Sequence, residues 1–287
     1  MASLKDLRRR IRATKSMQQI FKAMEMVAAA KLRRAQQRAQ SASPYAAKIS
    51  AMLANLSGAA AELEHPLFKV REVRTTALVL ITADRGFAGA YNTAILRVAE
   101  QRLKAAAPGS IQCVVVGRKG RDYLRRRGYP VLAAHTDLPG EASLELARRI
   151  TNDLTERFIA GEVDRVEILY THFVNAIVRR VLTATFLPIG TGIGSGDATS
   201  AAGSAIFEPD AESIFAELLP RYATAMLYAS MADALASEHS ARMVAMGSAR
   251  KNAGELVDAL TLTRNRMRQA AITREISELV GGAEALN

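Results

Sequence analysis

A seven-residue apolar repeat runs through the first sixty residues, and it constrains the fold more than any other feature. Alternating steps of three and four residues from Leu4 to Leu63 meet an apolar residue at fifteen of eighteen positions, and only Thr14, Gln18 and Glu25 are polar. Such a repeat is typical of a left-handed coiled coil. Ser3 is suited to be the N-cap, whereas Pro44 is the one local objection to a continuous helix.

The last seventy residues predict a second long helix. It runs from about residue 212 to 280, with Pro220 as an early interruption and a stop at Gly281 and Gly282. The same spacing gives a weaker seam, made of Met246, Ala249, Ala253, Leu256, Leu260, Thr263, Met267, Ala270, Arg274 and Ser277. At 1.5 Å per residue the two helices would be roughly 80–90 Å and roughly 100 Å long. We therefore expect them to wrap around each other as one rod.

The middle of the chain has the composition of an α/β domain. Strands are predicted at 75–82, 111–116, 165–171 and 179–187, and helices near 89–106, 118–127 and 142–160. This alternation favours a mostly parallel, Rossmann-like sheet covered by helices. The expected organisation is a coiled-coil rod from 1–64 and 210–287, an α/β domain at 70–190, and a flexible Gly/Ser-rich loop at 188–205.

The net charge of +11 is concentrated at the N-terminus. Residues 1–40 hold eleven Lys and Arg against only Asp6 and Glu25. This excess suggests an acidic protein surface, nucleic acid or an anionic membrane face as partner. The single cysteine, Cys113, lies in an apolar run and is interpreted as a buried strand residue of an intracellular chain. No apolar run reaches the roughly 20 residues that a membrane-spanning helix needs.

The loop ITADRGFAGAYN at 81–92 is the most motif-like segment. It follows a strand and opens a helix, where nucleotide folds bind phosphate, but its G-x-x-G spacing is a weak signal. We favour a structural turn in which Asp84 and Arg85 form hydrogen bonds within the loop. The basic run at 117–128 is interpreted as a solvated helix face. The four isolated histidines give no metal-ligand spacing, so we assign no catalytic, cofactor-binding or metal-binding residue.

Several stretches resemble one family over nearly the whole chain. KSMQQIFKAMEMVAAAKLRRAQQ at 15–37, residues 243–286, the 81–92 loop, FEPD at 207–210 and ASEHSARMVAM at 236–246 are similar to the gamma subunit of bacterial F-type ATP synthase. The resemblance implies a non-catalytic rotor shaft, the central stalk, built on an antiparallel coiled coil. Its partners would be the alpha and beta subunits of a hexamer, the epsilon subunit and the ring of c subunits. It would lie at the cytoplasmic face of the bacterial plasma membrane, attached only through the complex.

The resemblance also implies which residues contact the partners. Met24, Arg268, Gln269, Thr273 and Glu275 match positions that face beta subunits, with Lys22, Glu25 and Arg33 as weaker candidates on the first helix. Phe207 and Glu208 match the region that meets the c ring. Ala205 stands where the family often has an aromatic residue, which leaves a specific epsilon contact without support.

Two other functions compete with this interpretation. A basic coiled-coil protein could bind nucleic acid through residues 5–38, which explains the charge but not the middle domain. A nucleotide-binding enzyme could use the 81–92 loop. Without the resemblance, the arginines of the last helix, among them Arg264, Arg266, Arg268 and Arg274, are most simply solvated.

Overall fold

The structure is a computed structural model that describes residues 3–55, 65–190 and 211–284, with side chains described for 3–38, 65–190 and 215–281. Two long helices, α1 (Leu4–Asn55) and α6 (Ala211–Glu284), flank an α/β segment in the sequence. The chain divides into two compact units, one made of 1–28 with 243–287 and the other of 29–242. Each helix contributes residues to both units. The Gly/Ser-rich loop beyond Gly190, with Ala205, Phe207 and Glu208, lies outside the described residues, so the predictions made for it stay predictions.

The larger unit contains a five-stranded sheet in the order β3-β2-β1-β4-β5. Its strands are β1 (Thr76–Ile81), β2 (Ile111–Val116), β3 (Val131–His135), β4 (Arg165–Phe173) and β5 (Arg179–Leu187). β1 pairs in parallel with β2 and β4, β2 pairs in parallel with β3, and β5 is antiparallel to β4. The predicted mostly parallel sheet is confirmed. A short 3₁₀ helix, η1 (Pro66–Phe68), precedes the sheet and is capped by His65.

One strand was missed by the sequence prediction. β3 is short, lies at the edge of the sheet, and has one exposed and four half-buried residues instead of an alternating or fully buried pattern. An edge strand pairs on one side only, so its sequence is less restricted than that of a central strand.

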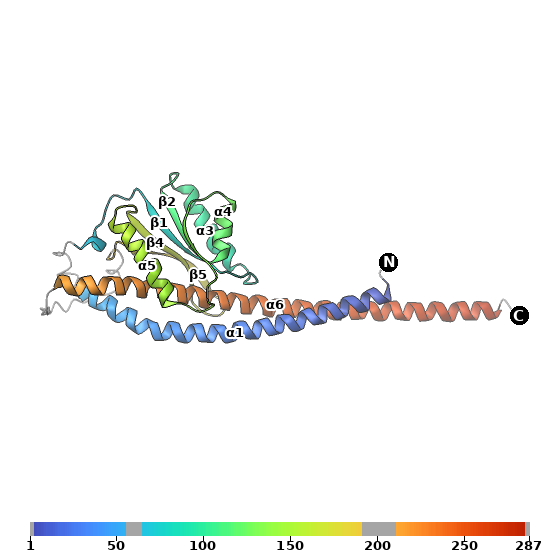
Figure 1. Ribbon diagram of the computed structural model, residues 1–287. Helices are drawn as coiled ribbons and strands as arrows, with labels where there is room; N and C mark the ends of the chain where they lie inside the picture. Colours follow the sequence, from blue (N-terminus) through green and yellow to red (C-terminus); the bar gives the residue numbers. More distant parts are fainter. Residues whose placement is uncertain (1–2, 56–64, 191–210, 285–287) are drawn as a thin grey trace. The chain divides into compact units, whose positions relative to one another are not determined.

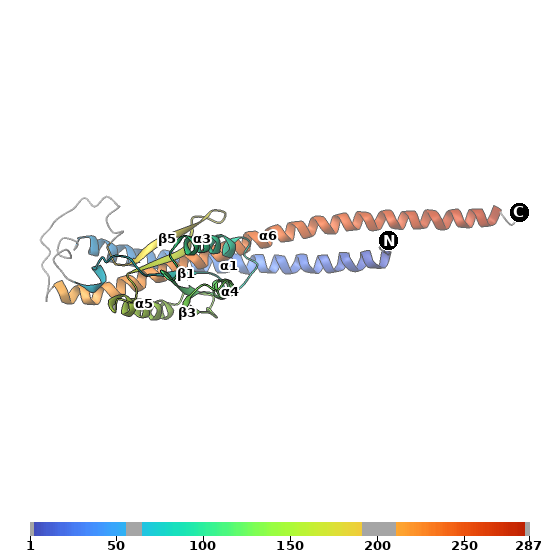
Figure 2. The same ribbon diagram turned by 90° about the horizontal axis from the view of Figure 1, so that it is seen from above.

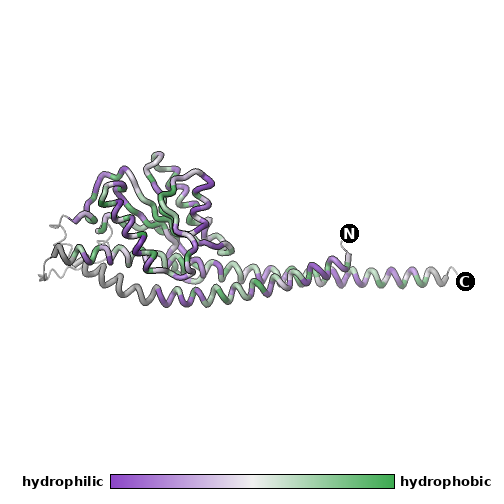
Figure 3. Tube along the Cα trace, viewed as in Figure 1, coloured by the Kyte–Doolittle hydropathy of each residue, from purple (hydrophilic) through white to green (hydrophobic). Residues whose placement is uncertain are grey.

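Helices cover both faces of this sheet, as Figures 1 and 2 show. The helices α3 (Tyr91–Ala105) and α4 (Arg118–Arg126) pack on one face, where Ile95 and Leu124 join Leu78 and Leu80 of β1. The helix α5 (Leu144–Ile159) and the first part of α6 pack on the other. Figure 3 shows the hydrophobic residues concentrated in the strands. Cys113 is buried in β2 as predicted, and burial raises the pKa of its thiol to about 12.

The seam predicted for α1 agrees with the burial pattern of the described residues. From Leu4 to Ala35 every position of the repeat is buried or half-buried, and Leu7, Ile11, Ala28, Leu32 and Ala35 are buried. The N-terminus of α1 is capped as predicted. The Asp6 amide donates to Ser3 Oγ at 3.1 Å, and the Ser3 hydroxyl donates back to the Asp6 carboxylate at 3.0 Å.

The seam predicted for α6 is wrong in part. Met246, Ala249, Ala253, Leu260 and Met267 are buried or half-buried as expected, but Leu256 is 51% exposed and Val257 is 7% exposed. Thr263 is likewise exposed, whereas Arg264 is half-buried. An α-helix has 3.6 residues per turn, so a strict 3.5-residue count drifts around its surface, and two successive steps of four correct the drift. Ala270, Arg274 and Ser277 are all exposed.

Predicted breaks in the helices are also corrected. Pro44 and Pro220 lie inside continuous helices, and α6 runs past Gly281 to Glu284. At Pro220 the Thr224 hydroxyl donates to the proline carbonyl at 2.8 Å, which gives that carbonyl a side-chain partner within the helix.

Candidate partner-binding surface

The last part of α6 has no helix beside it among the described residues of its own unit. Two contacts define the antiparallel register of the pair, because Glu25 lies against Gly247 and Gln18 lies against Gly254. Continuing this register to Leu4, where α1 begins, reaches Arg268. From Arg268 to Gly281 every residue of α6 is exposed. Within this unit the C-terminal end of α6 therefore projects past the start of α1 (Figures 1 and 2).

Four predicted contact residues lie on this projecting end. Arg268, Gln269, Thr273 and Glu275 are exposed, and their side chains make no hydrogen bond or ion pair with any described residue. The helix also carries an apolar stripe that the sequence prediction did not identify. Ile272, Ile276 and Leu279 follow at helical spacing, and Leu279 is 75% exposed. Contiguous exposed apolar residues are typical of interaction surfaces, so the stripe indicates a surface that another molecule covers.

A second unpartnered stripe surrounds Met24 on α1. Met17, Ile20, Met24 and Val27 follow at steps of three, four and three, and three of them are more than half exposed. Met24 itself is half-buried. The stripe is separate from the seam, which passes through Phe21, Glu25 and Ala28. It could have been found in the sequence by listing the apolar residues that remain once the seam is assigned.

Exposed cations surround the start of α1. Arg8, Arg9, Arg10, Arg12 and Lys15 are all exposed, and in the described residues of this turn only Arg9 has a carboxylate partner, Asp6, at 3.3 Å. Hydrogen bonds from Ser3, followed by the nearby arginines, lower the pKa of Asp6. The positive charge predicted from the sequence is therefore available at the surface.

The 81–92 loop forms a structural junction in the larger unit. Asp84 Oδ1 accepts a hydrogen bond from the Arg118 amide at 2.7 Å, and Oδ2 accepts one from the Leu138 amide at 2.6 Å. The carboxylate thus ties the loop after β1 to the loops after β2 and β3. Asp84 thus has a structural role, but its hydrogen bonds go to two other loops and not, as predicted, within its own. Arg85 is exposed and makes no hydrogen bond among the described residues.

Helix α6 lies across the carboxyl ends of β1 and β4, where ligands bind in open parallel sheets. Tyr91 at the start of α3 donates to the Ala234 carbonyl at 3.1 Å, and Arg242 donates to the Gly86 carbonyl at 3.2 Å. Asp233 accepts from the Phe173 amide at 2.8 Å and pairs with His172 at 2.5 Å. These polar groups are thus used within the chain.

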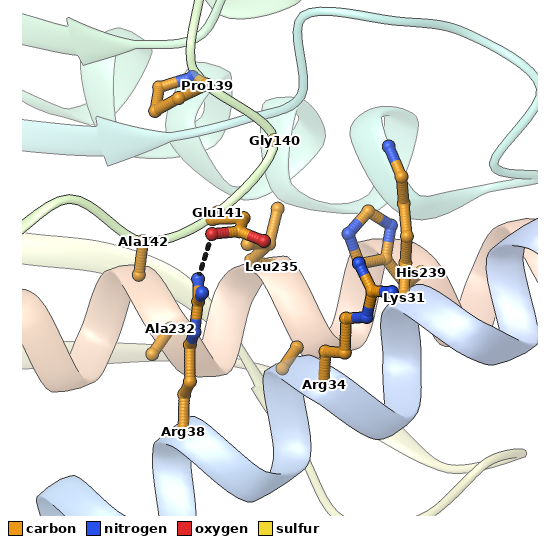
Figure 4. A pocket seen from close by; sticks show the side chains of 11 residues that line it. Lys31, Arg34, Arg38, Pro139, Gly140, Glu141, Ala142, Ala232, Leu235 and His239 are labelled. Carbon is orange, nitrogen blue, oxygen red and sulfur yellow. Dashed lines mark ion pairs between the residues drawn. The ribbon is translucent and has the colours of Figure 1, made fainter.

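A small pocket lies in the same unit between α1, α6 and the loop at 139–142 (Figure 4). Arg38 of α1 forms an ion pair with Glu141 at 2.5 Å, and Lys31 and Arg34 lie beside His239. Burial, followed by the charges of Arg242 and Lys31, lowers the pKa of His239 to about 4. Burial raises the pKa of the neighbouring Glu238, although Arg242 pairs with it at 2.6 Å.

In the described parts of the chain, no group of three or more His, Cys, Asp or Glu side chains has the arrangement of a metal site. None of the described helices combines the length and the hydropathy needed to cross a bilayer.

Comparison with known proteins identifies the family. The family model described as ATP synthase matches residues 3–286. The ATP synthase gamma chain of Desulforamulus reducens is 46% identical over 286 residues, with all of both chains covered. That of Moorella thermoacetica is 45% identical over 287 residues, again with full coverage.

Solved structures share the fold at lower identity. A chain of the Euglena gracilis mitochondrial ATP synthase, in a structure of OSCP, F1 and the c-ring in rotational state 3, matches with a TM-score of 0.70 and 18% identity. The match covers 99% of this chain and 94% of that one. A chain from the central stalk and c-ring of the Tetrahymena thermophila enzyme matches with a TM-score of 0.61 and 24% identity, covering 80% and 99%. The chain, with its paired terminal helices and α/β unit, belongs to the ATP synthase gamma chain family.

Proposed function

We propose that the chain is the rotor shaft of a bacterial F-type ATP synthase. It couples rotation of the c ring to conformational change in the catalytic beta subunits, and in reverse it couples ATP hydrolysis to proton pumping. The observation that carries this proposal is the projecting end of α6, which has exposed apolar and charged residues with no partner in its own unit. Full-length similarity to gamma chains supports it.

The shaft acts by differential binding. At each angle it presents a different face to each beta subunit, and a face that binds one conformation more tightly shifts that subunit toward it. Met24, with the stripe of Met17, Ile20 and Val27, offers apolar contact to a beta subunit. Arg268 and Gln269 offer hydrogen-bond donors to a carboxylate-bearing loop, and Thr273 and Glu275 lie one to two turns further along.

The other parts of the chain have different partners in this proposal. The α/β unit, with Phe207 and Glu208, serves as the foot on the c ring, beside the epsilon subunit. The chain then lies at the cytoplasmic face of the plasma membrane and is attached to it through the complex. ATP chemistry stays in the beta subunits, so this subunit is non-catalytic. The Asp84 junction, whose carboxylate is satisfied within the chain, is consistent with that role.

Reconstitution tests the proposal. The full chain is co-expressed with the alpha and beta subunits of the same organism, and the purified complex is attached to a surface through beta. With a bead on the α/β unit, we expect ATP-dependent rotation in one direction and one copy of the chain per hexamer. Failure to assemble, together with salt-dependent binding of the free chain to DNA, would instead support the nucleic-acid function.

A further inference from the structure

Two glycines on α6 face the two longest polar residues of the α1 seam. Gly247 and Gly254 are seven residues apart inside a helix, where glycine is destabilising relative to alanine. Gln18 and Glu25 are also seven residues apart, at positions where a coiled coil normally has apolar residues. All four belong to the same compact unit.

Each glycine makes room for the residue opposite. A Cβ atom at position 254 would lie 2.9 Å from Gln18 Nε2, and one at position 247 would lie 3.2 Å from Glu25 Oε1. Both distances are shorter than ordinary van der Waals contact. The ends of the two polar side chains therefore lie against the backbone of α6. A side chain at 254 would push the Gln18 amide aside, and one at 247 would move the Glu25 carboxylate by a few tenths of an ångström.

An ion pair marks only one of the two glycine positions. Arg250 Nε donates to Glu25 Oε2 at 2.8 Å, and Arg250 lies three residues after Gly247. The residue three positions after Gly254 is Val257, which is buried. Both glycines thus leave a notch, that is, space for a long side chain of α1. A carboxylate at Gly247 would have Arg250 as its neighbour, whereas one at Gly254 would have Val257.

This difference matters because the seven-residue apolar repeat of α1 makes registers displaced by one heptad the nearest alternatives to the described one. In one shifted register Glu25 would lie opposite Gly254, where the notch still accepts it, but Val257 replaces its cationic partner and Gln18 lies opposite Thr261. A shift in the other direction places Gln18 opposite Gly247 and also separates Glu25 from Arg250. Every register other than the described one, whole-heptad shifts included, therefore places at least one of the two long polar residues against a side chain.

We propose that the Gly247 and Gly254 notches, occupied by Glu25 and Gln18, and the Glu25–Arg250 ion pair together select one register of the α1–α6 pair. The selection acts through a difference between registers, because a carboxylate against Val257 is penalised whereas a carboxylate beside Arg250 is not. This inference concerns the fold of the chain itself and holds whether or not the chain turns inside a hexamer.

Distance measurement between two spin labels tests the proposal on the full chain. Arg8→Cys and Asn252→Cys place labels at exposed positions on the two helices, and the native Cys113 is buried and does not compete for the reagent. A shift of one heptad moves the labels by about 10 Å along the axis. We expect one distance population in the labelled parent, at the value of the register described here.

Removing the ion pair should add a second population. In Arg250→Ala we expect a population displaced by about 10 Å, and in the exchanged variant Glu25→Arg/Arg250→Glu we expect the single parental distance again. Arg266→Ala, an exposed arginine on the same helix, is the matched control and should leave the distance unchanged. A single parental distance in Arg250→Ala, or a second population that the exchange does not remove, would overturn the role of the pair.

A second pair of variants tests the notches. Gly254→Ala should broaden the distance distribution, because the new methyl group meets Gln18, and Gln18→Ala/Gly254→Ala should restore a narrow one. If Gly254→Ala alone leaves the distribution narrow, the notch does not restrict the register. A circular-dichroism spectrum of each variant establishes that the helices are present when the distances are recorded.

Discussion

Arg268 lies opposite Leu4, the first residue of α1, so α6 has no described helix beside it from this residue on. A substitution at Arg268 can therefore affect partner binding without affecting the stability of the chain. Its guanidinium is exposed and makes no hydrogen bond or ion pair with the described residues of the chain. We therefore expect Arg268→Ala to leave the unfolding midpoint of the isolated chain unchanged. In the hexamer the same variant should lower ATP-driven torque or assembly yield, because a charge-assisted contact is lost. Unchanged torque and assembly in a single-molecule rotation assay would contradict the assigned contact.

His239 makes stability depend on pH. Its pKa falls to about 4 in the folded chain because it is buried and because Arg242 and Lys31 lie close by, whereas an exposed histidine titrates near 6.5. Between these values the unfolded chain binds more protons, so stability falls as pH drops from about 6.5 to about 4. The loss amounts to at most about 3 kcal/mol and is complete below that range.

His239→Gln should flatten this dependence. Urea unfolding of the full chain at pH 7 and pH 5 measures it, and we expect a smaller difference for the variant than for the parent. Glu238 opposes the trend, because its raised pKa favours the protonated form in the folded chain and stabilises it toward low pH. The comparison between parent and variant removes that contribution, since Glu238 is present in both. An equal pH dependence in the two proteins would contradict the role of His239.

The two parts of α6 that follow Leu256 contribute differently to the stability of the chain. α6 from Gln269 onward is exposed on all sides in the described residues, so deleting 269–287 should leave the thermal midpoint of the isolated chain within about 2 °C of the parent. Deleting 257–287 also removes Val257, Leu260, Arg264 and Met267 from the pair and should lower the midpoint clearly. Circular dichroism measures both, and equal losses would contradict this division of α6.

The sequence predicted α1 better than α6 for a physical reason. The 3.5-residue count matched α1 at every described position to Ala35, but it placed Leu256 and Thr263 in the seam where Val257 and Arg264 lie. A count from one chain segment cannot show where the helix adds a step of four, because that depends on which residues of the partner lie opposite. For the same reason the sequence did not predict that Gln18 and Glu25 face glycines, because those glycines are more than two hundred residues away in the chain.

The candidate site was predicted unevenly for a similar reason. Arg268, Gln269, Thr273 and Glu275 came from resemblance, and the structure adds that they lie beyond the reach of α1. The sequence did not predict the stripe of Ile272, Ile276 and Leu279, because apolar residues at helical spacing in a long helix are equally typical of a coiled-coil seam. That these residues have no partner among the described residues of their own unit follows only from the structure, in which α1 begins at Leu4, opposite Arg268.

In the molecule as a whole, α6 is the helix that runs from the sheet of the larger unit into the helix pair of the smaller one. α6 is joined to the sheet by Tyr91, Asp233 and Arg242, all through hydrogen bonds at the carboxyl ends of β1 and β4. Asp233→Ala leaves the Phe173 amide without its acceptor and should cost about 1–3 kcal/mol of unfolding free energy. Glu217→Ala, which removes an exposed pair on the same helix, should cost less than about 1 kcal/mol. Urea titration compares them, and similar losses would contradict the anchoring role of Asp233.

The crevice that other parallel sheets leave open for a small molecule is occupied here by a helix of the same chain. A twisting force applied to this unit would pass between the sheet and α6 through the backbone of β1, β4 and α6 and through the hydrogen bonds that join them. The described part of α1 in that unit is held to the 139–142 loop by the half-exposed Arg38–Glu141 ion pair. Within this unit α6 is therefore tied to the sheet and the segment after β1 by hydrogen bonds that each include a backbone group, whereas the described part of α1 is tied to a loop by a side-chain ion pair.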